Sequence, residues 1–268
     1  MKTIVPIVQN FVALFVSSKF EVKIMYKVLD IKKWKRYKQY KWFSSFVNPC
    51  YGIDATIDVT DVVNYSKATK TSFFINFLYV VTKAINEVEE MRLRVVNNEV
   101  LLYDVIHPTY TIAIDSGTFE NGGHEMSFDY PTFYERASKE IESKKHKMAT
   151  VDTYNSDSYD CLYITCLPWL DFKSFSHPIP SANVESLSVP RICWSKFTLQ
   201  DNLYVLTLNI TVSHALVDGE PLCRCFNIIR ENCNFWYNLC VEKINKKIWR
   251  IENEKKSNFN CLSSFISI

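Results

Sequence analysis

The sequence predicts an α/β fold, a single two-layer domain in which a mixed, largely antiparallel sheet is flanked by helices. Apolar and polar residues alternate over residues 204–212, which is the pattern of a strand with one apolar face. Apolar residues recur at helical spacing over residues 74–88, as in a buried helix. Short apolar runs at residues 100–103, 109–114 and 161–167 are typical of further strands. Neither an internal repeat nor a linker rich in Pro, Gly or Ser divides the chain, so we expect one domain.

The ends of the predicted helices carry local signals. Ser72 is a candidate N-cap for the helix over residues 72–90, and a second helix is predicted over residues 133–147. Gly122 and Gly123 predict a loop before that second helix. Near the end of the chain, Gly219 permits a tight turn and Pro221 suits a first helical position. The apolar stripe of this last helix consists of Leu222, Cys225, Phe226, Ile229, Cys233 and Trp236.

Composition excludes several classes of protein. The chain has 268 residues, of which 47% are hydrophobic, enough for one sizeable core. A net charge of +2 argues against a dedicated polyanion binder. Nine cysteines occur without a C-x-x-C pair, which favours free thiols in the cytoplasm over a disulfide framework or a zinc site. The dinucleotide, P-loop and G-x-S-x-G signatures are all missing, so neither nucleotide chemistry nor a serine acyl-enzyme is expected.

Residues 31–43 interleave aromatic and basic side chains, which admits two interpretations. One is a surface for nucleic acid. The other, which we favour, is an amphipathic helix whose aromatic side packs inward while the lysine stems lie along it. The favoured interpretation predicts no nucleic-acid partner. The apolar stretch over residues 4–16 is too short to span a bilayer, so we expect no membrane partner either.

The residue with the clearest chemical potential is His214, which directly follows the strand and precedes the turn before the last helix. By parity it continues the apolar face of the strand. A histidine partly withdrawn from water can stay neutral and act as a general base toward a hydroxyl or a thiol. Asp218 either orients it or pairs elsewhere. The other interpretation, a satisfied structural histidine at a strand end, stays open on this string alone.

Four segments, taken in sequence order, bear on the choice between these two interpretations of His214. They are Trp34-Lys35-Arg36, Val105-Ile106-His107-Pro108-Thr109-Tyr110-Thr111, Leu167-Pro168-Trp169-Leu170-Asp171-Phe172-Lys173-Ser174-Phe175, and Ser213-His214-Ala215-Leu216-Val217-Asp218-Gly219. Together they resemble the chloramphenicol acetyltransferase family over residues 25–236. The resemblance implies an N-terminal extension at residues 1–24, an acyltransferase-like domain at 25–240 and a basic, polar tail at 241–268.

The resemblance implies direct transfer of an acetyl group from acetyl-CoA to a hydroxyl acceptor. His214 matches the family's general base, whose near ring nitrogen is held by its own backbone carbonyl. Asp218 matches a residue that pairs with an arginine matching Arg36, a pair that supports the shape of the site. Ser174 matches the serine that stabilises the oxyanion; its alternative is an ordinary loop hydroxyl.

Further implied features concern the ligands and the assembly. Phe197, next to Lys196, falls where the family places an aromatic residue near coenzyme A; its alternative is a core aromatic. The acceptor pocket departs from the pattern, with Ala113 in place of a phenylalanine and with Trp42 and Phe43 in place of a Phe-Tyr pair. Chloramphenicol, and hence antibiotic resistance, is therefore a candidate rather than a conclusion.

The family implies a homotrimer with its sites between subunits, and it implies no metal. Two rival functions remain beside it. One is a dihydrolipoyl acyltransferase core, which shares a similar D-H-x-x-x-D-G string. The other is a catalytically silent trimer of the same fold that binds a small molecule or a partner.

Overall fold

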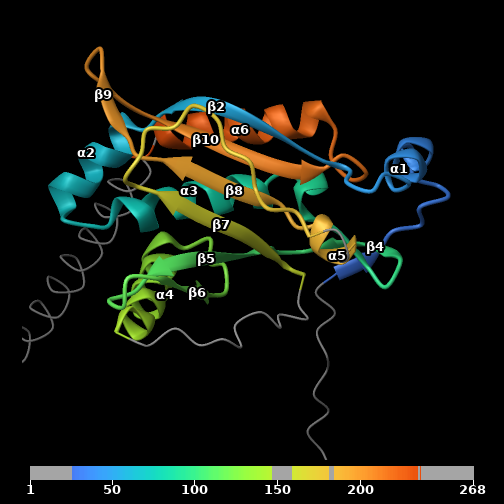
Figure 1. Cartoon of the computed structure of the whole chain (residues 1–268), viewed down its shortest axis with the longest axis horizontal. Helices are drawn as coiled ribbons and strands as arrows, with labels where there is room; N and C mark the ends of the chain where they lie inside the picture. Colours follow the sequence, from blue (N-terminus) through green and yellow to red (C-terminus); the bar gives the residue numbers. More distant parts are fainter. Residues whose placement is uncertain (1–25, 147–158, 181–183, 235, 237–268) are drawn as a thin grey trace, which may run out of the picture.

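The computed structural model describes residues 26–146, 159–180, 184–234 and 236 (Figure 1). The predicted extension at residues 1–24 and the predicted tail at residues 241–268 lie outside this described part. The two boundaries between these three segments therefore stay predictions.

A seven-stranded sheet forms the body of the molecule, with six strands in the order β2-β10-β8-β7-β5-β6 and β9 paired to β10 (Figure 1). Its strands are β2 (Cys50–Asp58), β5 (His107–Ala113), β6 (Phe119–Gly123), β7 (Cys161–Leu167), β8 (Arg191–Ser195), β9 (Thr198–Gln200) and β10 (Leu203–Ser213). Neighbouring strands are antiparallel except at the β5–β7 and β7–β8 pairs, which are parallel. The predicted mixed, largely antiparallel sheet is confirmed.

A second, smaller sheet lies beside the first and contains three antiparallel strands in the order β1-β4-β3. These strands are β1 (Tyr26–Val28), β3 (Leu93–Val96) and β4 (Glu99–Tyr103), and the short 3-10 helix η1 (Glu89–Arg92) leads into β3. The buried guanidinium of Arg94 on β3 donates to the backbone oxygens of Tyr159 and Cys161, next to and within β7. This side chain ties the small sheet to the main one.

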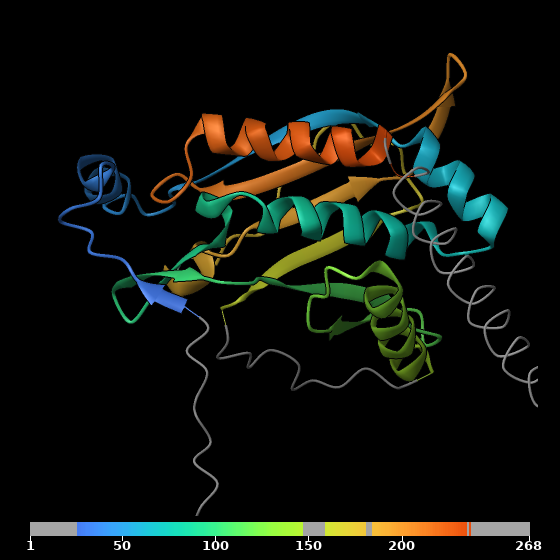
Figure 2. The ribbon, with the colours of Figure 1, turned by 180° about the vertical axis from the view of Figure 1, so that it is seen from behind.

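Helices cover one face of the main sheet, as the view from behind shows (Figure 2). Helix α3 (Phe73–Asn86) is almost entirely buried, and Ser72 caps it by accepting a hydrogen bond from the backbone of Ile75, as predicted. Helix α6 (Gly219–Asn234) contacts α3 and buries the predicted stripe, and Trp236 beyond it is 1% exposed. The remaining helices are α1 (Tyr37–Phe43), α2 (Thr60–Thr69), α4 (Tyr130–Lys145) and α5 (Val184–Leu187).

The opposite face of the sheet is also covered, which the alternation in β10 did not reveal. Leu208 and Ile210 are fully buried toward the helices, but Asn209 and Thr211 on the other face are only 1% and 8% exposed. The chain that follows β7 crosses this face in front of β8 and β10 (Figure 1), and the Asn209 amide donates to the backbone oxygen of Phe175 there. A polar face buried in this way has to satisfy its hydrogen bonds internally.

One local prediction was wrong and a second was right only in part. Gly122 and Gly123 do not form a loop but lie in β6, where a Cβ on Gly122 would stand 2.4 Å from Ile112 Cδ1 on β5. These glycines permit close packing, and the turn lies at Gly117, whose φ is 84°. The amphipathic helix predicted within residues 31–43 is confirmed in part: α1 covers residues 37–43, and Trp34 and Tyr40 pack against the core while the lysines are exposed. Trp42 departs from the prediction, because its side chain is 61% exposed. In the part of the chain that the structure describes, no helix has the length and apolar character to cross a membrane.

Candidate active site

His214 lies in the short connection between β10 and α6. Its backbone N–H donates to the Pro49 oxygen at 2.9 Å, which continues the β2–β10 ladder one residue beyond Ser213. The chain then turns, because the backbone N–H of Val217 donates to the Ser213 oxygen at 2.9 Å. Residues 215–217 are apolar and buried, so the turn is anchored in the core on one side. The position of His214 is therefore set by both flanking elements.

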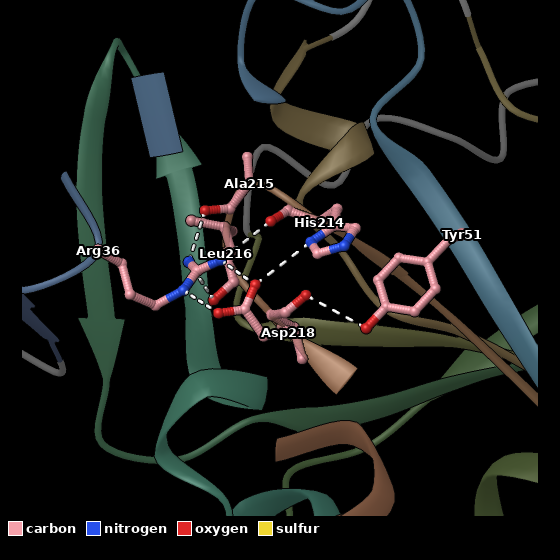
Figure 3. A network of polar contacts seen from close by, with 7 residues as sticks. Arg36, Tyr51, His214, Ala215, Leu216 and Asp218 are labelled. Carbon is pink, nitrogen blue, oxygen red and sulfur yellow. Dashed lines mark hydrogen bonds and ion pairs between the residues drawn. The ribbon is translucent and has the colours of Figure 1, made fainter. Parts of the chain in front are cut away.

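Two aromatic rings hold the imidazole of His214. The ring of Phe43, from the end of α1, stacks on it with centroids 3.9 Å apart and planes 10° apart. The ring of Tyr51, on β2, lies 4.6 Å away at a tilt of 38°. Nδ1 is buried without a well-formed hydrogen bond, yet it lies 3.3 Å from Asp218 Oδ1 (Figure 3). The side chain is 33% exposed, although Nδ1 itself is buried.

Arg36 holds the whole turn together (Figure 3). Its Nε donates to Asp218 Oδ2 at 2.6 Å and its Nη2 donates to Asp218 Oδ1, which makes a bidentate ion pair. Its remaining donor capacity goes to three successive backbone oxygens, those of His214, Ala215 and Leu216. The hydrogen bonds and charge of Arg36 lower the pKa of the Asp218 carboxyl, with His214 adding a smaller effect. The carboxylate is thus held ionised beside the imidazole.

This arrangement differs in one respect from what the resemblance implies. The backbone oxygen of His214 accepts from Arg36 Nη2 at 3.1 Å instead of from its own Nδ1. The group nearest to Nδ1 is Asp218. The geometry therefore gives Asp218 two neighbours, the guanidinium and the imidazole.

Tyr51 is a member of the site that sequence reasoning missed. It lies directly opposite Val212 in the β2–β10 pairing, and its hydroxyl donates to the Val217 oxygen at 3.4 Å. Burial raises its pKa to about 12, so the phenol stays neutral. Its presence depends on the pairing of strands that are about 160 residues apart in the sequence, which no local pattern indicates.

Ser174 lies elsewhere in the same chain. Its hydroxyl donates to Asp54 Oδ2 at 3.2 Å, and Asp54 lies opposite Asn209 in the β2–β10 pairing. His214 is five residues beyond Asn209. At ~3.3 Å per residue of strand this is roughly 16 Å. One chain does not bring its own Ser174 to its own His214.

The remaining candidates are also separated from His214. Phe197 precedes β9, with its ring 4.7 Å from Phe73 and 5.7 Å from Tyr204, and is half-buried. The neighbouring Lys196 side chain is exposed. Tyr204 is ten residues before His214 on β10, which corresponds to about 33 Å along the strand. Ala113 is exposed at the end of β5.

Trp42 is exposed, with its ring 4.7 Å from that of Phe43. Of the predicted site residues, the structure gathers Arg36, Phe43, His214 and Asp218 at one place. Within the described ranges, no group of three or more His, Cys, Asp or Glu side chains is placed to hold a metal ion.

Comparison with known proteins agrees with this fold. Residues 24–230 match the sequence model of the chloramphenicol acetyltransferase family. A chloramphenicol acetyltransferase of Escherichia coli is 24% identical over 214 residues, which are 79% of this chain and 95% of that protein. One of Bacillus pumilus is 24% identical over 220 residues, 80% of this chain and 97% of that protein.

Solved structures give the same result. A chloramphenicol acetyltransferase superposes with a TM-score of 0.72 at 25% identity, covering 77% of this chain and 99% of that one. A dihydrolipoamide acetyltransferase of Azotobacter vinelandii superposes with a TM-score of 0.54 at 16% identity, covering 87% of this chain and 97% of that one. This second likeness concerns the fold alone.

The mixed sheet backed by helices has the fold of the chloramphenicol acetyltransferases, and the relatives that the chain matches identify it as an acyltransferase. Because the family model covers most of the chain, the protein belongs to the chloramphenicol acetyltransferase family.

Proposed function

We propose that the protein transfers the acetyl group of acetyl-CoA directly to a hydroxyl of a small acceptor, with His214 as the general base. The observation that carries this proposal is the fixed imidazole, which stacks on Phe43, has Nδ1 3.3 Å from Asp218 and keeps a side chain that is 33% exposed. A carboxylate beside Nδ1 favours the tautomer with its proton on Nδ1, which leaves Nε2 free to accept one. Asp218 does not relay protons, because its charge is committed to Arg36.

The proton and bond changes follow from that placement. His214 Nε2 takes the proton of the acceptor hydroxyl while the hydroxyl oxygen bonds to the acetyl carbon. The carbonyl oxygen becomes an oxyanion, which the Ser174 hydroxyl stabilises by a hydrogen bond. When the carbon–sulfur bond breaks, the proton on His214 passes to the departing thiolate of coenzyme A. No residue of the chain becomes acetylated.

We place this site between chains of a homotrimer. A base and an oxyanion donor have to reach the same reacting group at hydrogen-bond distance, and roughly 16 Å separates the two positions within one chain. His214 of one chain therefore works with Ser174 of a neighbour. Exposed apolar side chains accompany both groups: the rings of Trp42 and Phe46 contact that of Phe43, and Trp169 and Leu170 lie five and four residues before Ser174 in the sequence. Exposed apolar surface of this kind is typical of an interface.

The ligands follow from the same assignment. Phe197 and the exposed Lys196 are the proposed coenzyme A contacts on the Ser174 side of the interface. Phe43, Trp42 and Ala113 are the proposed acceptor contacts, and chloramphenicol is the first acceptor to test. We also propose a cytoplasmic location, since the cysteines that the structure describes are all free thiols.

The test is release of coenzyme A from acetyl-CoA by the purified protein, with chloramphenicol and a panel of other hydroxyl compounds. We expect turnover that depends on an acceptor and falls by at least about 1,000-fold in His214→Ala. Turnover on another acceptor only would keep the mechanism and exclude chloramphenicol. Equal turnover in the wild type and His214→Ala would overturn the mechanism. Coenzyme A binding without any turnover would assign the chain to a silent trimer.

A further inference from the structure

Asp54 is a carboxylate in the middle of β2. It accepts hydrogen bonds from the segment that carries Ser174 and from Asn209 on β10. Its Oδ1 accepts from the backbone N–H of Phe175 at 3.2 Å and from the Asn209 amide at 2.9 Å. Its Oδ2 accepts from the Ser174 hydroxyl at 3.2 Å. The Asn209 amide also donates to the Phe175 oxygen at 3.1 Å. Two facing side chains of β2 and β10 thus bind both the backbone and the side chain of the Ser174 segment.

The strands beneath hold this pair in one orientation. Thr211, two residues along β10, donates its hydroxyl proton to Asn209 Oδ1 at 3.0 Å, which turns the amide nitrogen toward Asp54 and Phe175. Gly52 lies opposite Thr211, and a Cβ there would stand 2.5 Å from Thr211 Oγ1. The missing side chain of Gly52 leaves room for the threonine. A connected series of contacts therefore leads from the strand pairing to Ser174 itself.

The geometry points to Asp54 as a positioning residue that fixes Ser174 for its contact with the oxyanion. Ser174 is exposed on its own chain, so little else in that chain fixes its hydroxyl. A serine hydroxyl has a single proton, so in the reaction this proton has to turn from Asp54 to the oxyanion, while the other contacts of Asp54 keep the segment in place. The hydrogen bond from the backbone N–H of Phe175 to Asp54 fixes the position of the neighbouring Ser174. This inference rests on the proposed function, in which Ser174 stabilises the oxyanion.

The experiment measures kcat and KM for Asp54→Ala and Asp54→Asn in the assembled enzyme. Asp54→Ala removes every contact, and a displacement near 1 Å at such a site costs about 10- to 100-fold in kcat. We expect that loss with KM for acetyl-CoA changed less than about threefold, because the lost contact acts in the transition state. Asp54→Asn retains an acceptor for Phe175 and should keep at least about a third of kcat. A loss in Asp54→Asn as deep as in Asp54→Ala would overturn the hydrogen-bond basis of the inference.

Asp58→Ala is the matched control. Asp58 lies on the same strand and the same face, but its carboxylate accepts from Thr60 and not from the Ser174 segment. We expect a kcat within about twofold of the wild type. A loss equal to that of Asp54→Ala would show a general effect of β2 and contradict a specific role for Asp54.

Ser174→Ala and the Asp54→Ala, Ser174→Ala double variant separate positioning from an independent effect. If Asp54 acts through Ser174, the double variant is as slow as Ser174→Ala alone. The inference would be overturned if the kcat losses of the two single variants multiplied in the double variant, or if kcat were unchanged in Asp54→Ala. Either result would leave the His214 mechanism intact. An inactive wild type would overturn the proposed function instead. Amide hydrogen exchange at Phe175 would still test the anchor, since it should quicken in Asp54→Ala and not in Asp58→Ala.

Discussion

Arg36 does more for the site than any other single residue, although it never faces the acceptor. It binds Asp218 in two places and caps the oxygens of three successive residues in the turn around His214. The family resemblance implied the pairing with Asp218, but nothing in the local sequence did, because 182 residues separate the two partners. The carbonyl contacts were beyond sequence reasoning altogether, since backbone oxygens carry no residue-specific pattern.

Replacing Arg36 should therefore lower stability and activity together. Arg36→Ala leaves a carboxylate and three turn oxygens without their donor, which we expect to cost about 2–4 kcal/mol of unfolding free energy. Urea denaturation measures this loss. Lys35→Ala, at the exposed neighbouring position, is the control and should change stability by less than about 0.5 kcal/mol. An unchanged midpoint for Arg36→Ala would contradict the structural role given to the pair.

At the scale of elements, the strong periodic signals predicted β10, α3, α4 and α6 because each buries a regular face. The errors occurred where glycine or aromatic residues serve packing between elements. Gly122 and Gly123 permit close contact of β6 with β5, which a sequence does not distinguish from a turn. Trp42 has the spacing of a core residue but faces outward, as the proposed interface requires.

Gly52 tests the close packing of β2 on β10. A Cβ at Gly52 would meet Thr211 Oγ1 at 2.5 Å, whereas a Cβ at Gly219 would meet nothing within 4 Å. We expect Gly52→Ala to lower the unfolding free energy by about 1–3 kcal/mol through overpacking. Gly219→Ala should be neutral or slightly stabilising, because alanine suits the helix that begins there. Thermal denaturation of both variants measures the difference. Equal midpoints would show that β2 and Thr211 shift to accommodate the added methyl group without cost.

At the scale of the whole molecule, the chain separates the proposed catalytic groups onto two distant surfaces of one sheet. His214 lies beyond the end of β10, and Ser174 lies over its middle. The sequence order of the motifs indicated the family, yet it could not indicate this distance. Only the strand register, with Asp54 opposite Asn209, determines it.

Two half-buried histidines make stability dependent on pH across the whole fold. Burial, with nearby positive charge, lowers the pKa of His124 and of His177 to about 4. Both rings regain an ordinary pKa near 6.5 on unfolding, so the unfolded chain binds more protons between pH 6.5 and 4. Stability should fall as pH drops through that window. Urea midpoints at pH 7 and pH 5 measure it, and the fall should shrink when both histidines become glutamine. An equal fall in that double variant would assign it to other groups.

The central claim is that His214 of one chain works with Ser174 of another, and complementation tests it most directly. His214→Ala and Ser174→Ala chains are co-expressed in equal amounts, and coenzyme A release by the mixed assembly is compared with each variant alone. Random assembly at a heterologous interface places both wild-type residues together in about one site in four. We predict close to a quarter of wild-type turnover in the mixture, far above either parent. Turnover no greater than the average of the two variants would contradict a site shared between chains.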